Sequence, residues 1–187
     1  MAMINFPDMT NFPLLSTVRF DLVAFTEGNV SILHQFNSSL EMLWYIPRDV
    51  FKTVEQSRQK YEVMKSDYTL QKAIWWVIKR KSDELAVGYC GLFDMHSANA
   101  YAEIGYGILE PFWRQGIASE IIPCITAYGY KALNLHRIQA NINPENAASR
   151  KVIEKQGFSL EGHLKDTDFA RNKYFDRMVY ACLNPDH

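Results

Sequence analysis

The chain has 187 residues, 48% of them hydrophobic and 13% aromatic, a composition typical of a globular protein. Its formal net charge of −1 comes from 20 Lys and Arg against 21 Asp and Glu, which provides no electrostatic basis for direct nucleic-acid binding. The length fits one domain spanning residues 1–187, and no repeat, low-complexity segment or interdomain linker divides it.

The sequence carries no sign of a membrane segment, an export signal or a metal centre. No apolar run approaches the roughly 20 residues that cross a bilayer, and the N-terminus lacks a basic start followed by an apolar stretch. We therefore expect a cytoplasmic protein with no membrane partner. No two of the five histidines are four residues apart, so we expect no metal. Three widely spaced cysteines match neither a disulfide framework nor a metal-binding pair, and we expect buried thiols at Cys90, Cys124 and Cys182.

The first half of the chain mixes strand and helix patterns. Alternating or continuous apolar runs predict strands, and apolar residues three or four apart predict helices. Pro47 stops one segment, and Thr53 is a candidate cap for the next. In chain order we expect a strand over residues 18–25, a helix over 27–36, a short helix or turn over 40–47, an amphipathic helix over 53–67 and an apolar strand over 72–79.

The second half continues with an antiparallel meander and then alternates strands with helices. A helix over residues 117–133 contains Pro123, which removes one ladder donor, so we expect a bend or an open hydrogen bond near it. Gly157 marks the end of the following helix. The elements are strands over residues 85–94 and 100–109, the helix just described, a strand over 137–142, a helix over 146–156, and a final hairpin of residues 158–165 and 174–183 around a loop.

The most informative segment is the turn before the helix over residues 117–133, which reads Trp-Arg-Gln-Gly-Ile-Ala-Ser from Trp113 to Ser119. A tight turn into a helix leaves backbone N–H groups without partners, and the helix dipole adds partial positive charge, so the turn can hold a phosphate. Neither the dinucleotide-binding nor the Walker-type glycine pattern occurs, so another phosphorylated cofactor is indicated.

Further short motifs follow this turn in a fixed order, and together they resemble the GCN5-related N-acetyltransferase (GNAT) family. The stretch Ala-Glu-Ile-Gly-Tyr before the turn is similar to the branch of ribosomal-protein alanine and serine N-acetyltransferases. In order and spacing, the resemblance covers roughly residues 87–183. The matching positions are Gly116 and Ala118 in the turn, Asn146 and Ser149 at the next helix start, and Lys155, Gly157 and Phe158 at its end.

The resemblance implies an α+β fold with a mostly antiparallel sheet of six or seven strands, splayed centrally, and with helices on both faces. It implies acetyl-CoA as cosubstrate, its pyrophosphate held by residues 114–119 and its pantetheine arm paired with the strand edge in the opening. Arg114 adds a phosphate contact or is merely solvated. The implied cofactor-binding residues are Ile108, Leu109, Arg114, Gln115, Gly116, Ile117, Ala118, Ser119, Asn146 and Ser149.

Two carboxylates compete for the role of the base that takes the amine proton. Glu103 is the lone carboxylate in the apolar strand before the turn, where the family often places its base; the alternative is a solvent-facing strand residue. Asp168 lies in the segment where the resembling branch carries an acidic residue, although Asp166 is nearby and a solvated loop carboxylate is the alternative.

The proton donor for the departing thiolate is less clearly indicated. Many family members carry a tyrosine four residues beyond Ser149, but here that position is Ile153. Ser149 is the substitute in the resembling branch; the alternative is helix-start hydrogen bonding near Asn146, which itself either caps the helix or binds the pantetheine amide. Six aromatic residues are candidates either for lining a pocket for a peptide or small amine or for packing in the core: Trp75, Trp76, Tyr101, Tyr106, Phe169 and Tyr174.

The sequence thus predicts an N-acetyltransferase that passes acetyl from acetyl-CoA directly to a primary amine. The resemblance favours a protein N-terminus of the ribosomal-protein type as acceptor. A small amine such as a polyamine, an amino acid or an antibiotic is the alternative acceptor. A CoA-binding module without turnover is a third interpretation, because the tyrosine at position 153 is missing. Exposed aromatic residues are compatible with a homodimer.

Overall fold

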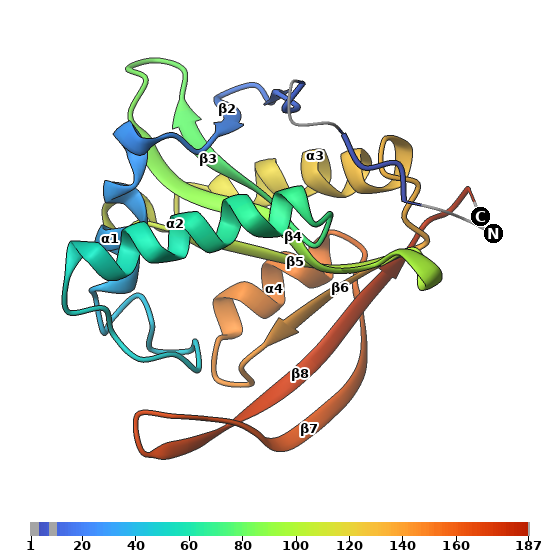
Figure 1. The fold of residues 1–187 in the computed structure, drawn as a ribbon. Coiled ribbons are helices and arrows are strands. Elements are labelled where there is room, and N and C mark those ends of the chain that lie inside the picture. Colours follow the sequence, from blue (N-terminus) through green and yellow to red (C-terminus); the bar gives the residue numbers. More distant parts are fainter. Residues whose placement is uncertain (1–3, 8–10, 187) are drawn as a thin grey trace.

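The computed structural model describes residues 4–7 and 11–186, which form one eight-stranded sheet with helices on both faces (Figure 1). Its neighbouring strands are antiparallel except for one parallel pair, β5 with β6. The spatial order is β1 (Leu15–Ser16), β2 (Phe20–Ala24), β3 (Ile74–Arg80), β4 (Ala86–His96), β5 (Tyr101–Ile108), β6 (Arg137–Ile142), β8 (Lys173–Leu183) and β7 (Ser159–Ala170).

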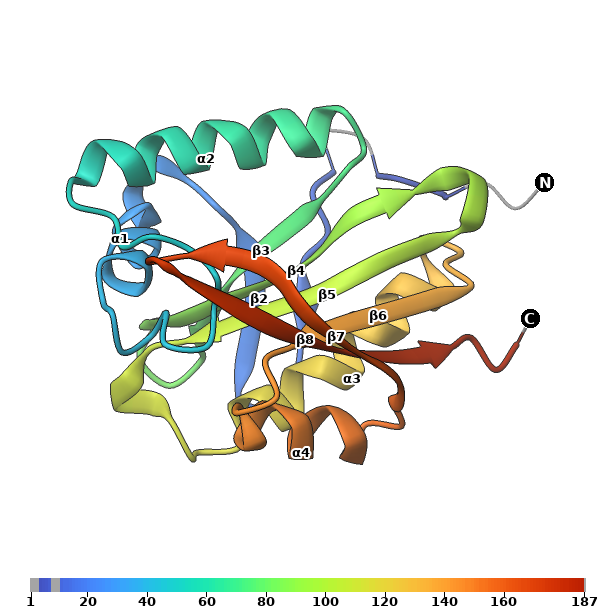
Figure 2. The same ribbon diagram turned by 90° about the horizontal axis from the view of Figure 1, so that it is seen from below.

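Two helices cover each face of the sheet (Figure 2). On one face, α1 (Ser31–Asn37) and α2 (Val54–Thr69) enclose a core around Leu33, Tyr61 and Tyr89. On the other face lie α3 (Ile117–Lys131) and α4 (Ala147–Lys155), above a larger core that includes Ile121 and Tyr180. Burial alternates residue by residue along β6, because its apolar side chains face α3 and α4 while its polar ones face the other side.

The sheet is split between β5 and β6, as the family resemblance implied. Parallel pairing joins only three residue pairs, from Tyr101 with Arg137 to Glu103 with Gln139, after which the strands separate. Residues 104–108 of β5 therefore have no partner strand on this side. Both α3 and α4 begin just beyond the separated ends, because each follows one of the two strands in sequence.

Several element bounds differ from the predictions. The expected helix over residues 27–36 begins with a 3-10 turn, Glu27–Asn29, and becomes α-helical only at Ser31. Residues 40–45 form turns, in agreement with one of the two predicted forms. The eighth strand, β1, escaped prediction because two residues are too short to show alternation. Helix α3 runs through Pro123, which has no N–H for the Ser119 carbonyl four residues earlier.

The last hairpin is the largest correction, because no loop separates its strands. β7 and β8 are joined by a two-residue turn, Arg171–Asn172, in which both residues have positive φ, 49° and 57°. This backbone is suited to tight hairpins. The side chains of β7 are almost all exposed, so its charged residues resembled a loop in the sequence. Asp168 consequently lies on a strand, opposite Phe175.

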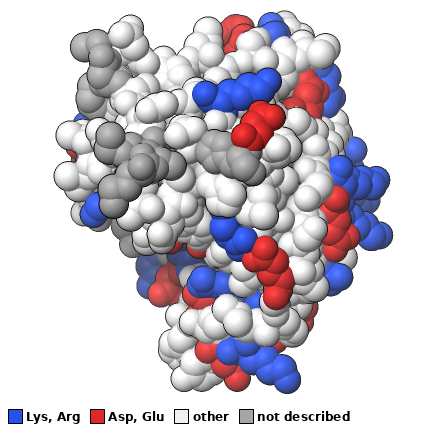
Figure 3. Space-filling model, turned by 90° about the vertical axis from the view of Figure 1, so that its right-hand side faces the viewer, with Lys and Arg blue, Asp and Glu red and all other residues white. Residues whose placement is uncertain are grey.

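The surface agrees with the balanced composition. Figure 3 shows positive and negative side chains interspersed on one face of the molecule. No helix in residues 4–7 and 11–186 combines the length and apolar character needed to span a bilayer. The three cysteines are free, but only Cys90 is fully buried; Cys124 and Cys182 are partly exposed, contrary to the expectation of buried thiols.

Candidate active site

The turn before α3 presents free backbone amides. Gly116 is the N-cap residue, with φ 73° and ψ 13°, a left-handed conformation that favours glycine. No side chain caps this helix end, and the first intrahelical bond runs from the amide of Glu120 to the carbonyl of Gly116. The amides of residues 117–119 therefore have no helical acceptor, which is the arrangement that binds a phosphate.

The same turn is held in place by Arg19, next to β2. One guanidinium nitrogen, Nη1, donates to the carbonyl of Gln115 at 3.0 Å, and Nε donates to Glu120 Oε2 at 2.6 Å. The hydroxyl of Thr17 also donates to Glu120, at 2.7 Å. These contacts occupy the Glu120 carboxylate, the acidic group in the first turn of α3, and fix the turn before any ligand arrives.

The edge of β5 that faces the split offers main-chain groups for an extended ligand. The amide of Leu109 donates to the carbonyl of Val87 at 2.9 Å, so it points towards β4. Main-chain groups of an antiparallel strand alternate in direction, so those of Ile108 and Tyr106 point into the split. The carbonyl of Ile108 already accepts the indole N–H of Trp113 at 2.7 Å, so its amide is the group at this position that a ligand in the split could use.

Across the split, the start of α4 brings together Asn146, Ser149 and Tyr106. Asn146 caps the helix, because its Oδ1 accepts the Ser149 amide at 3.0 Å. This contact uses the side-chain oxygen and leaves the side-chain N–H groups for a ligand carbonyl. Ser149 Oγ lies 2.7 Å from the hydroxyl of Tyr106, a side chain that reaches over from β5.

Glu103 is half-buried on the opposite face of β5 from the Ser149 contact. The hydroxyl of Tyr101 donates to Glu103 Oε1 at 3.1 Å. Burial raises the pKa of Glu103 above its usual range, and this effect outweighs the opposing hydrogen bonds from Tyr101 and Asn141. A carboxylate with a raised pKa is a better proton acceptor at neutral pH, so the environment suits a general base.

Asp168 has a different environment. Its carboxylate forms a bidentate ion pair with Arg177 of β8, with contacts of 2.7 and 2.9 Å from Nη2, and it also accepts the hydroxyl of Thr167 at 3.0 Å. These donors occupy both carboxylate oxygens.

A cavity of about 520 Å³ lies beside Glu103 on the α2 side of the sheet. The rings of Trp75 and Phe93 stack in its wall with centroids 5.2 Å apart. Its volume is in the range of small-molecule sites, and its mixed charges suit a polar ligand with an amine. The lining residues are Asp67, Lys72, Ala73, Trp75, Phe93, Asp94, Glu103 and Arg177.

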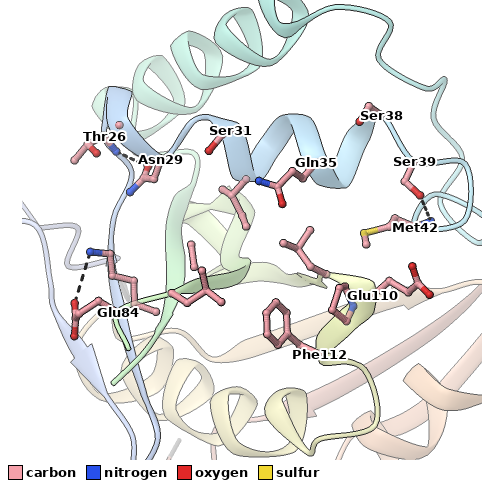
Figure 4. Close-up of a pocket in the computed structure, with 17 residues that line it drawn as sticks. Thr26, Asn29, Ser31, Gln35, Ser38, Ser39, Met42, Glu84, Glu110 and Phe112 are labelled. Carbon is pink, nitrogen blue, oxygen red and sulfur yellow. Dashed lines mark hydrogen bonds and ion pairs between the residues drawn. The ribbon is translucent and has the colours of Figure 1, made fainter. Parts of the chain in front are cut away.

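A larger pocket, of about 980 Å³, lies between α1, the β3–β4 turn and the 3-10 turn Glu110–Phe112 (Figure 4). Gln35 extends into it from α1, and an ion pair of 3.8 Å joins Lys79 and Glu84 at one side. Leu109 is the one predicted site residue in its lining, and no candidate base or acid is present there. The candidate base Glu103 instead lines the smaller cavity, and Ser149 lies at the adjoining split.

The sequence did not single out Arg177, Asn141 or Tyr106 as partners of the candidate catalytic residues. Tyr106 was recognised only as one of several aromatic residues, because its contact with Ser149 joins positions 43 apart in sequence. Of the other aromatic candidates, Trp75 lines the cavity, whereas Trp76 is fully buried in the core. Phe169 and Tyr174 are exposed at the hairpin tip, 62% and 63% accessible.

The split sheet and the free amides at its wide end place the protein in the class of acyltransferases whose sheet opens to receive coenzyme A. Comparison of the sequence with protein-family models identifies the family within this class. Residues 19–159 match the family model described as an acetyltransferase (GNAT) domain, so the chain belongs to the GNAT acetyltransferases. It is an acetyl-CoA-dependent N-acetyltransferase.

Proteins similar to this chain include N-acetyltransferases of several kinds. The uncharacterized N-acetyltransferase YoaA of Bacillus subtilis is 30% identical over 174 residues, covering 93% of this chain and 98% of YoaA. The ribosomal-protein-serine acetyltransferase of Escherichia coli is 33% identical over 103 residues, covering 55% of this chain and 57% of that enzyme. The fold matches spermidine N-acetyltransferase from Vibrio cholerae, solved with CoA and spermine, with a TM-score of 0.80 at 21% identity, covering 88% and 95% of the two chains.

Proposed function

We propose that this enzyme acetylates the N-terminal amine of a protein, with Glu103 as the base. The observation that carries the proposal is the position of Glu103, a half-buried carboxylate of raised pKa in the wall of a cavity beside the split. An amine in this cavity lies on one side of β5, while the split that receives the thioester opens along the edge of the same strand.

In this mechanism the cofactor is bound mainly by main-chain groups. The amides of residues 114–119 bind the pyrophosphate. The amide of Ile108 and the side chain of Asn146 bind the pantetheine arm, and the hydroxyl of Ser149 donates a hydrogen bond to the sulfur. Holding both reactants in attack geometry supplies about 7 to 11 kcal/mol, and proton transfer to Glu103 adds about 10²- to 10⁴-fold. Asp168, bound by Arg177, is the weaker candidate for the base.

A protein acceptor is supported by the similarity to the ribosomal-protein-serine acetyltransferase over about half of each chain. The small-amine alternative is favoured by the fold that the chain shares with a spermidine N-acetyltransferase. Both acceptors present a primary amine to the same base, so the cavity chemistry alone suits either. The free cysteines and the use of acetyl-CoA support a cytoplasmic site of action.

The experiment is an assay of CoA release with a matched panel of acceptors. Peptides with free N-termini are compared with the same peptides blocked by N-terminal acetylation, and with spermidine, amino acids and aminoglycosides. The proposal predicts CoA release with free peptides and none with the blocked ones. Turnover of small amines alone would contradict the protein acceptor. Calorimetric binding of acetyl-CoA without any turnover would instead identify a binding module.

A further inference from the structure

The contact between Tyr106 and Ser149 joins the two sides of the split sheet. Tyr106 belongs to β5, and its partner residue across the antiparallel pair is Cys90 of β4. Ser149 belongs to the first turn of α4, the helix that follows β6. Their hydroxyl oxygens are 2.7 Å apart, an ordinary hydrogen-bond distance for two hydroxyl groups, and the side chain of Tyr106 packs against the α3 and α4 core.

The hydroxyl of Ser149 has one proton to donate. The group that accepts this proton determines whether Ser149 can donate a hydrogen bond to a ligand in the split. Its backbone amide is already used by Asn146, so the helix cap does not involve the hydroxyl. If Ser149 donated to Tyr106, no proton would remain for a ligand in the split. If Tyr106 donates, the Ser149 proton is free.

The relative acidity of the two hydroxyl groups favours the second arrangement, with Tyr106 as the donor. Burial raises the pKa of the Tyr106 phenol, and the hydrogen bond with Ser149 only partly offsets this effect. The phenol therefore keeps its proton at neutral pH. A phenol is a stronger acid than an aliphatic alcohol, so it is the better donor of the pair.

We propose that Tyr106 is a positioning residue that donates its hydrogen bond to Ser149 and so directs the Ser149 hydroxyl proton at the leaving sulfur of coenzyme A. This inference rests on the proposed function, because it concerns the same reaction. It places an aromatic hydroxyl one hydrogen bond behind Ser149, in a chain whose position 153 is isoleucine.

The reaction then balances without ionising Tyr106. The amine nitrogen forms the bond to the acetyl carbon and loses one proton to Glu103, and the electron pair of the carbon–sulfur bond leaves with sulfur. The resulting thiolate accepts the hydrogen bond from Ser149 and takes a proton from water after release. A thiol is a much stronger acid than an alcohol, so a thiolate leaves more readily than an alkoxide; stabilisation by a hydrogen bond is then sufficient, and full proton transfer from the phenol is not required.

The first test uses the variants Tyr106→Phe, Ser149→Ala and their combination. We expect Tyr106→Phe to lower kcat about tenfold, with the Kd of acetyl-CoA changed less than about twofold. Adding Ser149→Ala to the Tyr106→Phe variant should lower kcat by less than a further factor of about two, because the two hydroxyls act as one unit. Independent, multiplicative losses, or an unchanged kcat in Tyr106→Phe, would overturn the inference.

The second test needs no acceptor amine, so it separates this inference from the proposed function. The thiol pKa of bound CoA is titrated by the ultraviolet absorbance of its thiolate. We expect it to be lower in the wild type than in Tyr106→Phe and Ser149→Ala, which should agree with each other. Equal thiol pKa values in the wild type and Tyr106→Phe would overturn the inference even in an active enzyme.

Tyr130→Phe is the matched control. It also removes a single tyrosine hydroxyl, whose hydrogen bond to the carbonyl of Cys182 is 2.9 Å, but it lies on α3 away from the Ser149 contact. We expect the kcat and thiol pKa of this variant to equal those of the wild type. If kcat and the thiol pKa changed as much in Tyr130→Phe as in Tyr106→Phe, general destabilisation would explain the effect, and the positioning role would be contradicted.

Discussion

Glu103 is the residue on which the proposed chemistry depends. Its strand and polarity pointed to a base, but the sequence left open whether it faces solvent; the structure places it in a cavity wall instead. Burial raises its pKa. The cavity that it lines is completed by residues distant in sequence, such as Trp75, which alternation within one strand cannot reveal. The tight ion pair of Asp168 with Arg177 is equally invisible in the sequence.

We predict that Glu103→Gln lowers kcat about 100-fold with near-normal affinity for acetyl-CoA. In the wild type, the rate should rise with pH as Glu103 loses its proton, at a pH above the usual range for a glutamate because its pKa is raised. The variant should lack this rise. Steady-state kinetics across pH test it, with Glu62→Gln, an exposed carboxylate paired with Lys65, as control. An identical pH profile in Glu103→Gln would move the base elsewhere.

Gly116→Glu tests the phosphate site. The substitution places a side chain in a left-handed position and adds negative charge at the free amides of α3, so the Kd of CoA should rise at least about tenfold. Gly157→Glu is the matched control, because Gly157 also has positive φ, 84°, but lies at the end of α4. Calorimetry on both folded variants makes the comparison. Equal loss of affinity in the two would show that strain, rather than the anion site, is responsible.

The buried amine of Lys60 makes the free energy of unfolding depend on pH. Burial, with a smaller contribution from Arg48, lowers its pKa to about 7. The unfolded chain therefore binds more protons above this pKa, and the free energy of unfolding rises with pH up to the usual lysine pKa. Lys60→Met should stabilise the protein more at about pH 6 than at about pH 9, measured by urea unfolding. An equal change at both pH values would refute the assignment; exposed Lys65→Met should give no stabilisation.

At the scale of elements, the tip of the β7–β8 hairpin is fastened to the loop after α1. Figure 2 shows the tip beside that loop. Arg171 donates to the carbonyls of Ile46 and Leu43 at 2.9 and 3.1 Å, and also to those of Trp44 and Arg48. The sequence indicated a hairpin here but placed Arg171 in an open loop, because its carbonyl partners lie more than 120 residues away.

We predict that Arg171→Ala lowers the free energy of unfolding by about 2 to 3 kcal/mol, because several loop carbonyls lose a charged donor together. Amide hydrogen exchange in residues 43–48 should also accelerate. Arg171→Lys, with fewer donors, should fall between the variant and the wild type. Arg58→Ala, which removes an exposed ion pair of 3.7 Å, should change stability by less than about 0.5 kcal/mol. Unchanged exchange in the loop would contradict the fastening role.

Across the full sheet, the order of elements was predictable from hydrophobic periodicity, whereas the split was predictable only as an implication of the family resemblance that the ordered motifs carry. β6 and the start of α3 fall where the pattern placed them. The two-residue strand β1 and the closed hairpin were not predictable, since one is too short for periodicity and the other has an exposed, polar strand. The pairing of Tyr106 with Ser149 depends on the split itself and appears only in three dimensions.

The proposed mechanism requires the split between β5 and β6 to present the thioester of acetyl-CoA between Ser149 and the cavity of Glu103. A crystal structure of the protein with CoA tests it most directly. We predict pyrophosphate density on the amides of residues 117–119 and the sulfur within hydrogen-bond distance of Ser149 Oγ. CoA bound elsewhere, for instance in the larger pocket beside α1, would contradict this mechanism.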